Sequence, residues 1–214
     1  MNPNDSPATA LPQDIQRCVT FHGHLCPGLV YGALVAREAV RLLRIERALD
    51  EEIVTISEND SCAVDGLQVL LGTTAGKGNL IVKDFGKNAY TVLHRDRRQA
   101  YRFCRKTAYA YSGKHPEEFR RLEAALTAGT ADAVQRKRQK QLKAADLLAK
   151  PFEAVFDTTA VEASIPPYAR LAPSKPCAAC GEMTMATKMV GSADDEFLCA
   201  PCSQQPGRLK ANWN

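Results

Sequence analysis

The stretch Phe21-His22-Gly23-His24-Leu25-Cys26-Pro27-Gly28 places two imidazoles and a thiol within five residues, directly before a predicted helix. Pro27 suits the first position of a helix, where its missing N–H group costs nothing. From Leu29 to Ile45, apolar residues recur along one stripe of a helix and arginines fall outside it. Cys26 is therefore predicted near the N-cap, where the positive end of the helix dipole favours a thiolate.

A second cysteine is predicted at the start of a second helix. Residues 52–57 alternate apolar and polar side chains, as a half-buried strand does, and residues 58–61 include types that favour an N-cap. Residues 62–71 then read as a helix that Gly72 ends. Cys62 begins this helix and Asp65 follows three residues later, so the two side chains are expected on one face.

The histidines and cysteines near these two helix starts form a candidate metal site. Their ligand types suit zinc, iron or nickel. Because His22 and His24 alternate in what reads as an extended loop, one is expected to be a ligand while the other packs or makes a hydrogen bond. The candidate ligands are His22, His24, Cys26 and Cys62.

Two other interpretations of these residues stay open. Cys26 or Cys62 could be a nucleophile, or an open metal site could activate water with Asp65 as the base. Each residue also has a structural interpretation, because a buried cysteine often packs as a small apolar side chain. Cys18 and Cys104 lie in periodic segments and are expected in the core.

The other predicted elements mix strands and helices. Residues 80–85 and 89–94 read as paired strands around a turn at 86–88. The remaining predictions, in chain order, are a short helix at 15–20, a strand at 101–105, helices at 115–128 and 131–149, and a strand at 152–156. This mixture indicates an α+β domain of helices and antiparallel sheet rather than a doubly wound sheet.

Four cysteines near the C-terminus predict a structural zinc site. Two C-x2-C pairs, Cys177/Cys180 and Cys199/Cys202, are separated by eighteen residues, which is the spacing of a four-cysteine zinc finger. The intervening segment could form a β-hairpin with arms at 185–190 and 196–198 and a turn between them. Four sulfurs would close the coordination sphere, and the metal would stabilise a domain too small to fold alone. The alternative is two separate redox-active pairs.

These signals predict a domain order and a compartment. Residues 1–13 are expected to be disordered, 14–163 to form the α+β domain, 164–176 a proline-rich linker, and 177–214 the finger and a tail. With neither a secretory signal nor a membrane-spanning apolar run, the protein is predicted to be cytoplasmic. The net charge of +4 is mild, and the basic run at 136–143 is expected to be a solvated helix face.

Four motifs resemble the formylmethanofuran dehydrogenase E-subunit family over about residues 14–160: those at 21–28, 58–65, 76–80 and 84–87. The resemblance extends to the C-terminal zinc finger that many members carry. It implies an α+β core with a metal-binding pocket, usually assembled as a homodimer. The implied pocket positions are His22, His24, Cys26, Cys62 and Asp65, with Lys77 and Asn79 near them as cofactor-binding candidates. The family often has a further cysteine near position 72, where this chain reads Gly72-Thr73-Thr74.

The resemblance leads to one functional expectation, beside which two alternatives stand. The expected function is an accessory subunit of a molybdenum- or tungsten-dependent formylmethanofuran dehydrogenase of one-carbon metabolism, with the finger docking or stabilising a partner. The first alternative is a stand-alone metal- or thiol-dependent enzyme acting on a small substrate. The second is a zinc-finger regulator that binds nucleic acid or polymerase; the acidic residues of the finger, Glu182, Asp194, Asp195 and Glu196, disfavour contact with phosphate.

Overall fold

The computed structural model describes residues 11–162, 164–191 and 197–204, and the chain divides into two compact units, Met1–Tyr168 and Ala169–Asn214. Three predictions fall partly or wholly outside the described residues. They are the disorder at 1–13, of which 1–10 are not described, the turn of the finger at 191–195, and the tail beyond 204.

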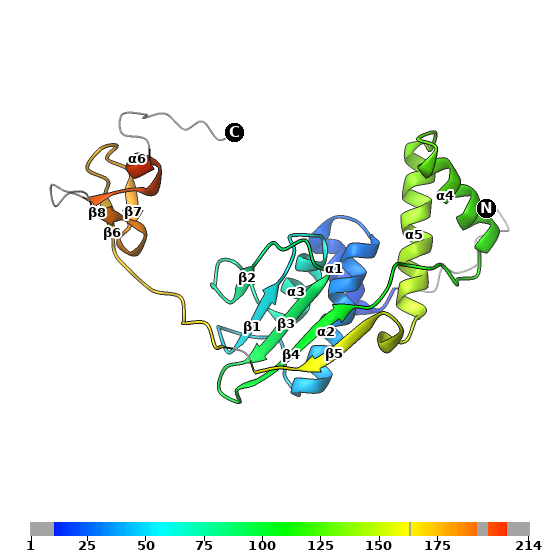
Figure 1. Cartoon of the computed structure of the whole chain (residues 1–214), viewed down its shortest axis with the longest axis horizontal. Helices are drawn as coiled ribbons and strands as arrows, with labels where there is room; N and C mark the ends of the chain where they lie inside the picture. The colour runs from blue at the N-terminus through cyan, green and yellow to red at the C-terminus, as the bar shows by residue number, and fades with distance from the viewer. Residues whose placement is uncertain (1–10, 163, 192–196, 205–214) are drawn as a thin grey trace. The chain divides into compact units, whose positions relative to one another are not determined.

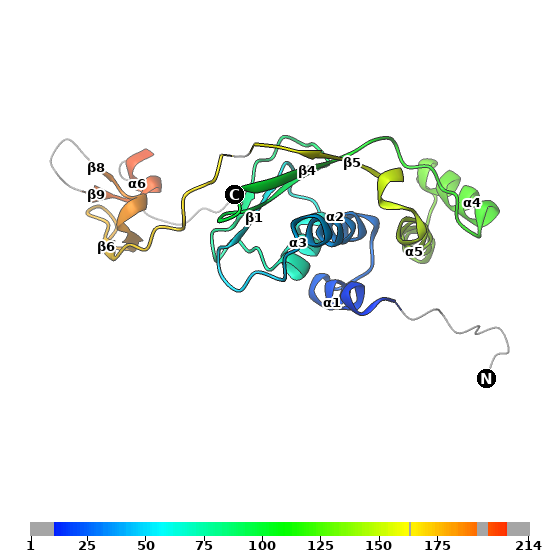
Figure 2. The same cartoon turned by 90° about the horizontal axis from the view of Figure 1, so that it is seen from below.

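The first unit is built in three layers: a sheet, two helices on one of its faces, and a third helix beneath those two (Figure 2). The helices α2 (Pro27–Leu43) and α3 (Ala63–Leu71) pack on the sheet, and α1 (Gln13–His22) packs against both. As predicted, α2 begins at Pro27 with Cys26 as its N-cap, and Gly72 ends α3 in the left-handed conformation. The predicted helix at 15–20 is longer, and it includes His22.

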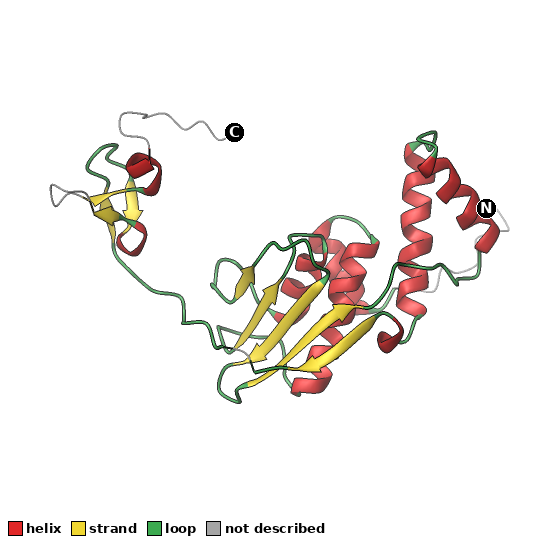
Figure 3. Cartoon of the chain, viewed as in Figure 1, coloured by secondary structure: helices red, strands yellow, loops and turns green. Residues whose placement is uncertain are grey.

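The sheet has five strands in the order β2-β1-β3-β4-β5 (Figures 1 and 3). β1 and β2 run parallel and the other neighbours antiparallel, so the predicted α+β class is confirmed with a mixed sheet. The strands are β1 (Ile53–Ser57), β2 (Leu80–Val82), β3 (Ala89–His94), β4 (Gln99–Arg105) and β5 (Phe156–Ala160).

Two strand predictions were wrong in detail. Residues 80–85 and 89–94 do not pair with each other, because β1 lies between β2 and β3. The connecting loop crosses the end of β1, where Phe85 N and Lys87 N both donate to Glu58 O. The strand expected at 152–156 starts only at Phe156, since residues Phe152–Ala154 form a 3-10 turn first.

Helices α4 (Pro116–Thr127) and α5 (Ala133–Ala149) form a helical hairpin within the first unit (Figure 1). The hairpin extends from the sheet and its covering helices, and α5 packs on α2. Asp132 and Gln135 form a capping box at the start of α5. Within the basic run at 136–143, Gln139 and Leu142 face inward while Arg136, Lys137, Arg138 and Lys140 are exposed. The exposed cations of the run form the solvated helix face that was expected, whereas Lys143 is half-buried.

Two glycines let α2 and α3 approach closely. A methyl group added at Gly32 would lie 1.9 Å from Ala63 O, and one added at Gly66 would lie 2.8 Å from Ala33 N. Larger side chains at these positions would push the helices apart. The N-termini of the two helices therefore lie side by side, and these are the ends that carry Cys26 and Cys62.

The second unit is a small finger of two short hairpins and one helix. β6 (Ser174–Pro176) pairs with β7 (Met183–Met185), and β8 (Val190–Gly191) pairs with β9 (Phe197–Leu198). A 3-10 turn at Ala186–Lys188 separates the hairpins, and α6 (Ala200–Gln204) follows. The predicted arms are found only in part, because 185–190 is divided between β7, the turn and β8.

Candidate metal centres

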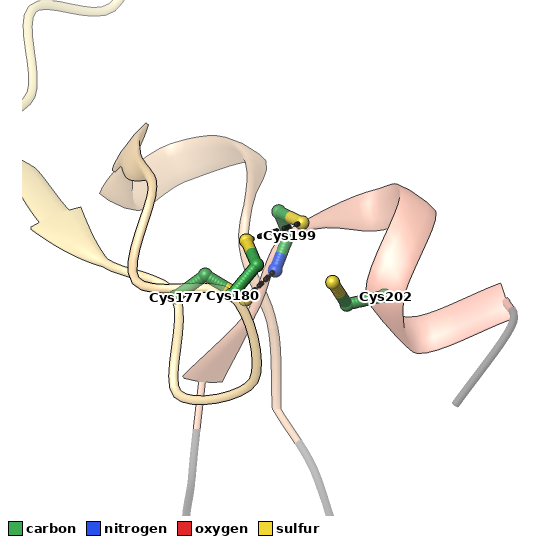
Figure 4. A group of neighbouring side chains, drawn as sticks. All are labelled: Cys177, Cys180, Cys199 and Cys202. Carbon is green, nitrogen blue, oxygen red and sulfur yellow. Dashed lines mark hydrogen bonds between the residues drawn. The ribbon is translucent and has the colours of Figure 1, made fainter. Parts of the chain in front are cut away.

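The four C-terminal cysteines converge, as predicted (Figure 4). Their sulfurs all lie within 4.8 Å of one another, and Cys180 Sγ is 3.9 Å from Cys199 Sγ. Cys177, Cys199 and Cys202 are buried. Among the described residues this is one of two groups of three or more His, Cys, Asp or Glu side chains whose ligand atoms gather this tightly.

Backbone N–H groups favour a negative charge on this cluster, which suits the binding of a cation. The left-handed Gly181 turns the chain after the first pair, and Gly181 N donates to Cys177 O at 2.8 Å. The N–H of Cys199 donates to Cys177 Sγ at 3.2 Å, and this bond is the main reason that the pKa of the Cys177 thiol falls to about 6. A thiolate within four gathered sulfurs is the donor set of a structural zinc site. The residues therefore fit the predicted finger.

The second group is His22, His24 and Cys26, whose ligand atoms also lie within 4.8 Å of one another. The expectation that the two imidazoles diverge was wrong, because His22 ends α1 rather than lying in an extended loop. Gly23 then reverses the chain with φ 88°. The two rings meet with their centroids 4.6 Å apart, so both histidines reach the same point.

Asp65 fixes the orientation of His22. Asp65 Oδ2 accepts from His22 Nδ1 at 2.7 Å, and Gln68 Nε2 donates to Asp65 Oδ1 at 3.3 Å. Since an ionised carboxylate only accepts, the tautomer of a neutral imidazole here has its proton on Nδ1 and its lone pair on Nε2. His22 Nε2 lies 3.6 Å from Cys26 Sγ. This order of carboxylate, imidazole and free lone pair is common behind metal-bound histidines.

Cys26 is the N-cap of α2 as predicted, but the residue is only 5% exposed. Leu29 N donates to its sulfur at 3.4 Å. Burial nevertheless raises the pKa of Cys26, and the neighbouring Cys62 thiol raises it further. Desolvation thus outweighs the backbone N–H groups at the start of α2, and the thiolate expected at this helix start is not favoured.

Cys62 borders this group without joining it. It is exposed at the N-terminus of α3, and a methyl group at Gly28 would lie 3.0 Å from Cys62 Cβ and 3.7 Å from its sulfur. The structure therefore brings His22, His24, Cys26 and Asp65 together, with Cys62 at the edge. A metal held by the first three side chains would keep a coordination position open.

Lys77 and Asn79 hold a loop rather than face this pocket. Asn79 is fully buried, with its amide donating to Asp50 O and Ile53 O and its oxygen accepting from Thr74 N. Lys77 Nζ donates to the carbonyls of residues 48–50. Both side chains bond to the backbone of neighbouring segments, so their proposed cofactor contact has no support in this geometry.

Sequence reasoning missed three contributors to the pocket. Gln68, three residues after Asp65, donates a hydrogen bond to Asp65 Oδ1. The helical spacing of the two residues was the signal in the sequence that could have indicated this contact. Gly28 leaves room for Cys62, and Gly23 turns the chain between the histidines. An open hollow of about 670 Å³ between α1 and α3 reaches Gln68 and is also lined by Arg17, Phe21 and Arg47.

The two remaining cysteines lie outside both groups. Cys18 is fully buried beside Ile15 and Leu29, as expected for a core residue. Cys104 is only half-buried on β4, which corrects its core assignment.

This fold and these clusters define the class of the molecule: a metal-binding α+β protein with an appended four-cysteine finger. The chain belongs to the family described as FmdE, molybdenum formylmethanofuran dehydrogenase operon, which matches residues 21–157. The match covers most of the sheet, the last residues of α1, the helices α2 to α5 and the whole N-terminal pocket.

Two known proteins resemble the chain over most of its length. A crystal structure of a tungsten formylmethanofuran dehydrogenase FmdE-like protein from Syntrophus aciditrophicus matches with a TM-score of 0.57 and 19% identity, over 91% of this chain and 92% of that one. A probable S-adenosyl-L-methionine-binding protein from Archaeoglobus fulgidus is 28% identical over 205 residues. This alignment covers 92% of the present chain but only 54% of the relative, so the chain spans about half of the relative's length.

None of the described helices is both long and apolar enough to cross a membrane.

Proposed function

We propose that this FmdE-family chain is a cytoplasmic protein with two metal centres, which serves as an accessory subunit of a molybdenum- or tungsten-dependent formylmethanofuran dehydrogenase. Cys177, Cys180, Cys199 and Cys202 hold a structural zinc ion. A second transition metal, for which zinc, iron and nickel are the candidates, is held by His22, His24 and Cys26, with Asp65 behind His22.

The convergence of His22, His24 and Cys26 carries this proposal. Three ligand atoms of types suited to a borderline metal lie within 4.8 Å, and one imidazole is already oriented by a carboxylate. Such a centre supplies Lewis-acid chemistry at its open position when the metal is bound. The hollow of about 670 Å³ is lined by Gln68, the residue that donates to Asp65, and by none of the three ligands.

Metal analysis of purified protein tests the two centres. We expect two equivalents per chain in the wild type, one in Cys26→Ala and one in Cys177→Ala. Cys104→Ala removes a thiol outside both groups and should retain two. A wild type with a single equivalent that disappears in Cys177→Ala would reduce the proposal to the finger alone.

The accessory role needs a separate test. The family description and the structural relative both point to formylmethanofuran dehydrogenase, and the finger offers a second unit for docking. Affinity-tagged protein produced in its native cells should co-purify with a molybdenum or tungsten oxidoreductase. If wild type and Cys177→Ala both return without such a partner, the accessory role loses its support.

A size-exclusion experiment on the same material tests the homodimer that the family resemblance implies.

One observation favours a second candidate function, a thiol-dependent enzyme. Cys26 Sγ, His22 and Asp65 form a connected line in which His22 Nε2 can accept the thiol proton. If Cys26 is a nucleophile, metal-depleted protein should react with iodoacetamide at Cys26 faster than at the similarly buried Cys18, and Asp65→Asn should slow that reaction. Equal rates at the two cysteines would rule out this alternative.

A further inference from the structure

A second cavity is lined by none of the candidate metal ligands. It has a volume of about 320 Å³ and is bounded by α2, α5 and the chain that follows β4. Its polar lining includes Tyr31, Arg105, Tyr109, Ser112 and Lys150, and Leu147 contributes an apolar wall. Cavities that bind small molecules have this composition, with a mainly apolar wall and a few polar groups that fix orientation.

A buried carboxylate organises one wall of this cavity. Asp146 is 5% exposed and accepts hydrogen bonds from Tyr109 Oη and from both the N–H and the hydroxyl of Ser112. Lys150 Nζ lies 3.1 Å from Asp146 and also donates to Ser112 Oγ. This network fastens the chain at 109–112 to α5, and it neutralises the charge of Lys150.

Two further cations, one in the cavity lining and one beside it, lie over aromatic rings. Arg105 lies with its guanidinium carbon 5.5 Å from the centre of the Tyr31 ring, and Lys143 Nζ is 4.4 Å from the centre of the Tyr109 ring. Within the described part of the chain, neither forms an ion pair within 4.0 Å. Burial lowers the pKa of Lys143; the carboxylate of Glu123 opposes this effect, and the charge of Arg105 adds to it. Of the two cations in the cavity lining, Arg105 and Lys150, Lys150 pairs with Asp146, while Arg105 forms no ion pair among the described residues.

We propose that this cavity binds a small organic anion, a carboxylate or a phosphate monoester. The guanidinium of Arg105 receives the anionic group, since its planar donors match both carboxylate and phosphate oxygens. Tyr31 supplies a hydroxyl group to the same lining as a further donor, and the carbon body of the ligand packs on Leu147. The lining of the cavity contains none of the proposed metal ligands, and the proposal does not depend on their function.

Calorimetric titration of the full-length, metal-loaded protein tests the site. The probes are benzoate and phenyl phosphate, with benzylammonium as the control of opposite charge. We expect saturable binding of at least one anion and none of the cation. The stronger anion tells whether the site prefers carboxylate or phosphate. Absence of saturable binding by both anions, or equal binding of benzylammonium, would overturn the proposal.

Matched variants locate the binding. Arg105→Gln should weaken the anion by about tenfold or more, because a charge-assisted hydrogen-bond pair is lost. Lys140→Gln removes an equal charge from the exposed face of α5 and should leave the affinity within about twofold, as expected for a screened surface charge. Equal weakening in both variants would mean that binding is nonspecific and would overturn the assignment.

A measurement on the wild type keeps the test independent of whether Arg105→Gln folds. In protein with 13C-labelled tyrosine, the ring signals of Tyr31 and Tyr109 should shift as the anion is added. The ring of Tyr168, which stacks on Arg95, should not shift. A shift of Tyr168 alone would place the anion elsewhere and overturn the assignment.

Discussion

Asp65 influences the proposed N-terminal metal through His22, whose Nδ1 it holds at 2.7 Å. A carboxylate in this place fixes the tautomer and direction of the imidazole and makes the other nitrogen a better donor. The same residue would be expected to matter much less if His22 were merely a surface side chain. Single substitutions can therefore separate a metal ligand from a residue that only orients one.

Asp65→Asn should weaken metal binding at the N-terminal centre by about 10- to 100-fold, the usual effect of losing such a partner. The stoichiometry at saturating metal should not change, because the three ligand atoms remain. Competition against a chelating indicator measures the affinity, with the exposed Asp96→Asn as the control. Equal affinities for Asp65→Asn and the control would show that Asp65 has no part in the centre.

The ion pair of Asp14 with Arg37 holds α1, and therefore His22, against α2. Arg37 donates two hydrogen bonds to Asp14, at 2.6 and 2.7 Å, and these hold the pKa of Asp14 below its usual value. A carboxyl whose pKa is lower when folded stabilises the protein above its unfolded pKa, and this contribution disappears as the pH falls through the folded value.

Asp14→Asn should therefore lower the free energy of unfolding by about 1 kcal/mol at pH 7, a modest value because both side chains are partly exposed. The difference between wild type and variant should shrink below about pH 4, where the carboxyl of the unfolded chain begins to take up its proton. Urea unfolding at several pH values measures it. A difference that stays constant down to pH 3 would contradict this account.

Much of the N-terminal pocket could be predicted from residue types alone, while its geometry could not. Two imidazoles and a thiol beside a helix start suggest a metal whatever the fold. That both imidazoles face one point depends on α1 reaching His22 and on the left-handed Gly23, and alternation along an assumed loop gave the opposite answer. The protonation preference of Cys26 also required its burial, which local sequence does not reveal.

At the scale of elements, helix ends were predictable and strand partners were not. Pro27 and Gly72 mark their helix ends by local backbone chemistry. The pairing of β2 and β3 with β1 instead depends on contacts between residues distant in sequence. The alternation of apolar and polar residues is the same whether two strands form a hairpin or lie on either side of a third strand. The close contact of α2 with α3 could not be predicted from the sequence either. A glycine within a helix can have several structural roles, and close packing against another helix is only one of them.

Gly32→Ala should destabilise the first unit by about 1–3 kcal/mol, the typical cost of overpacking. The added methyl group would lie 1.9 Å from Ala63 O, so the two helices must separate. Gly76→Ala is the matched control, because nothing lies within 4 Å of its added methyl group. Thermal unfolding compares the two variants, and equal stabilities would contradict the proposed role of the close approach.

At the scale of the whole molecule, the two units depend on different sources of stability. The first has a large apolar core that includes Tyr90, Phe103 and Leu67. The buried cluster of the second consists of cysteines, with Leu198 packed against it. A unit with so little apolar burial would need the proposed metal to stay folded.

Chelation of the metal should therefore unfold residues 174–191 and 197–204 while β1, β3 and β4 remain protected. Hydrogen exchange followed by mass spectrometry, with and without chelator, resolves the two units in the intact chain. Cys180→Ser should reproduce the effect of the chelator on the second unit without any chelator. Equal loss of protection in both units would contradict separate stabilisation.

The most direct test of the central claim is X-ray absorption at the metal edge of a variant whose finger is emptied by Cys177→Ala and Cys180→Ala. The remaining metal should show two imidazole nitrogens at about 2.0 Å and one sulfur at about 2.3 Å, with a further light atom at the open position. A variant without bound metal, or a metal without sulfur and imidazole in its shell, would contradict the assignment of His22, His24 and Cys26.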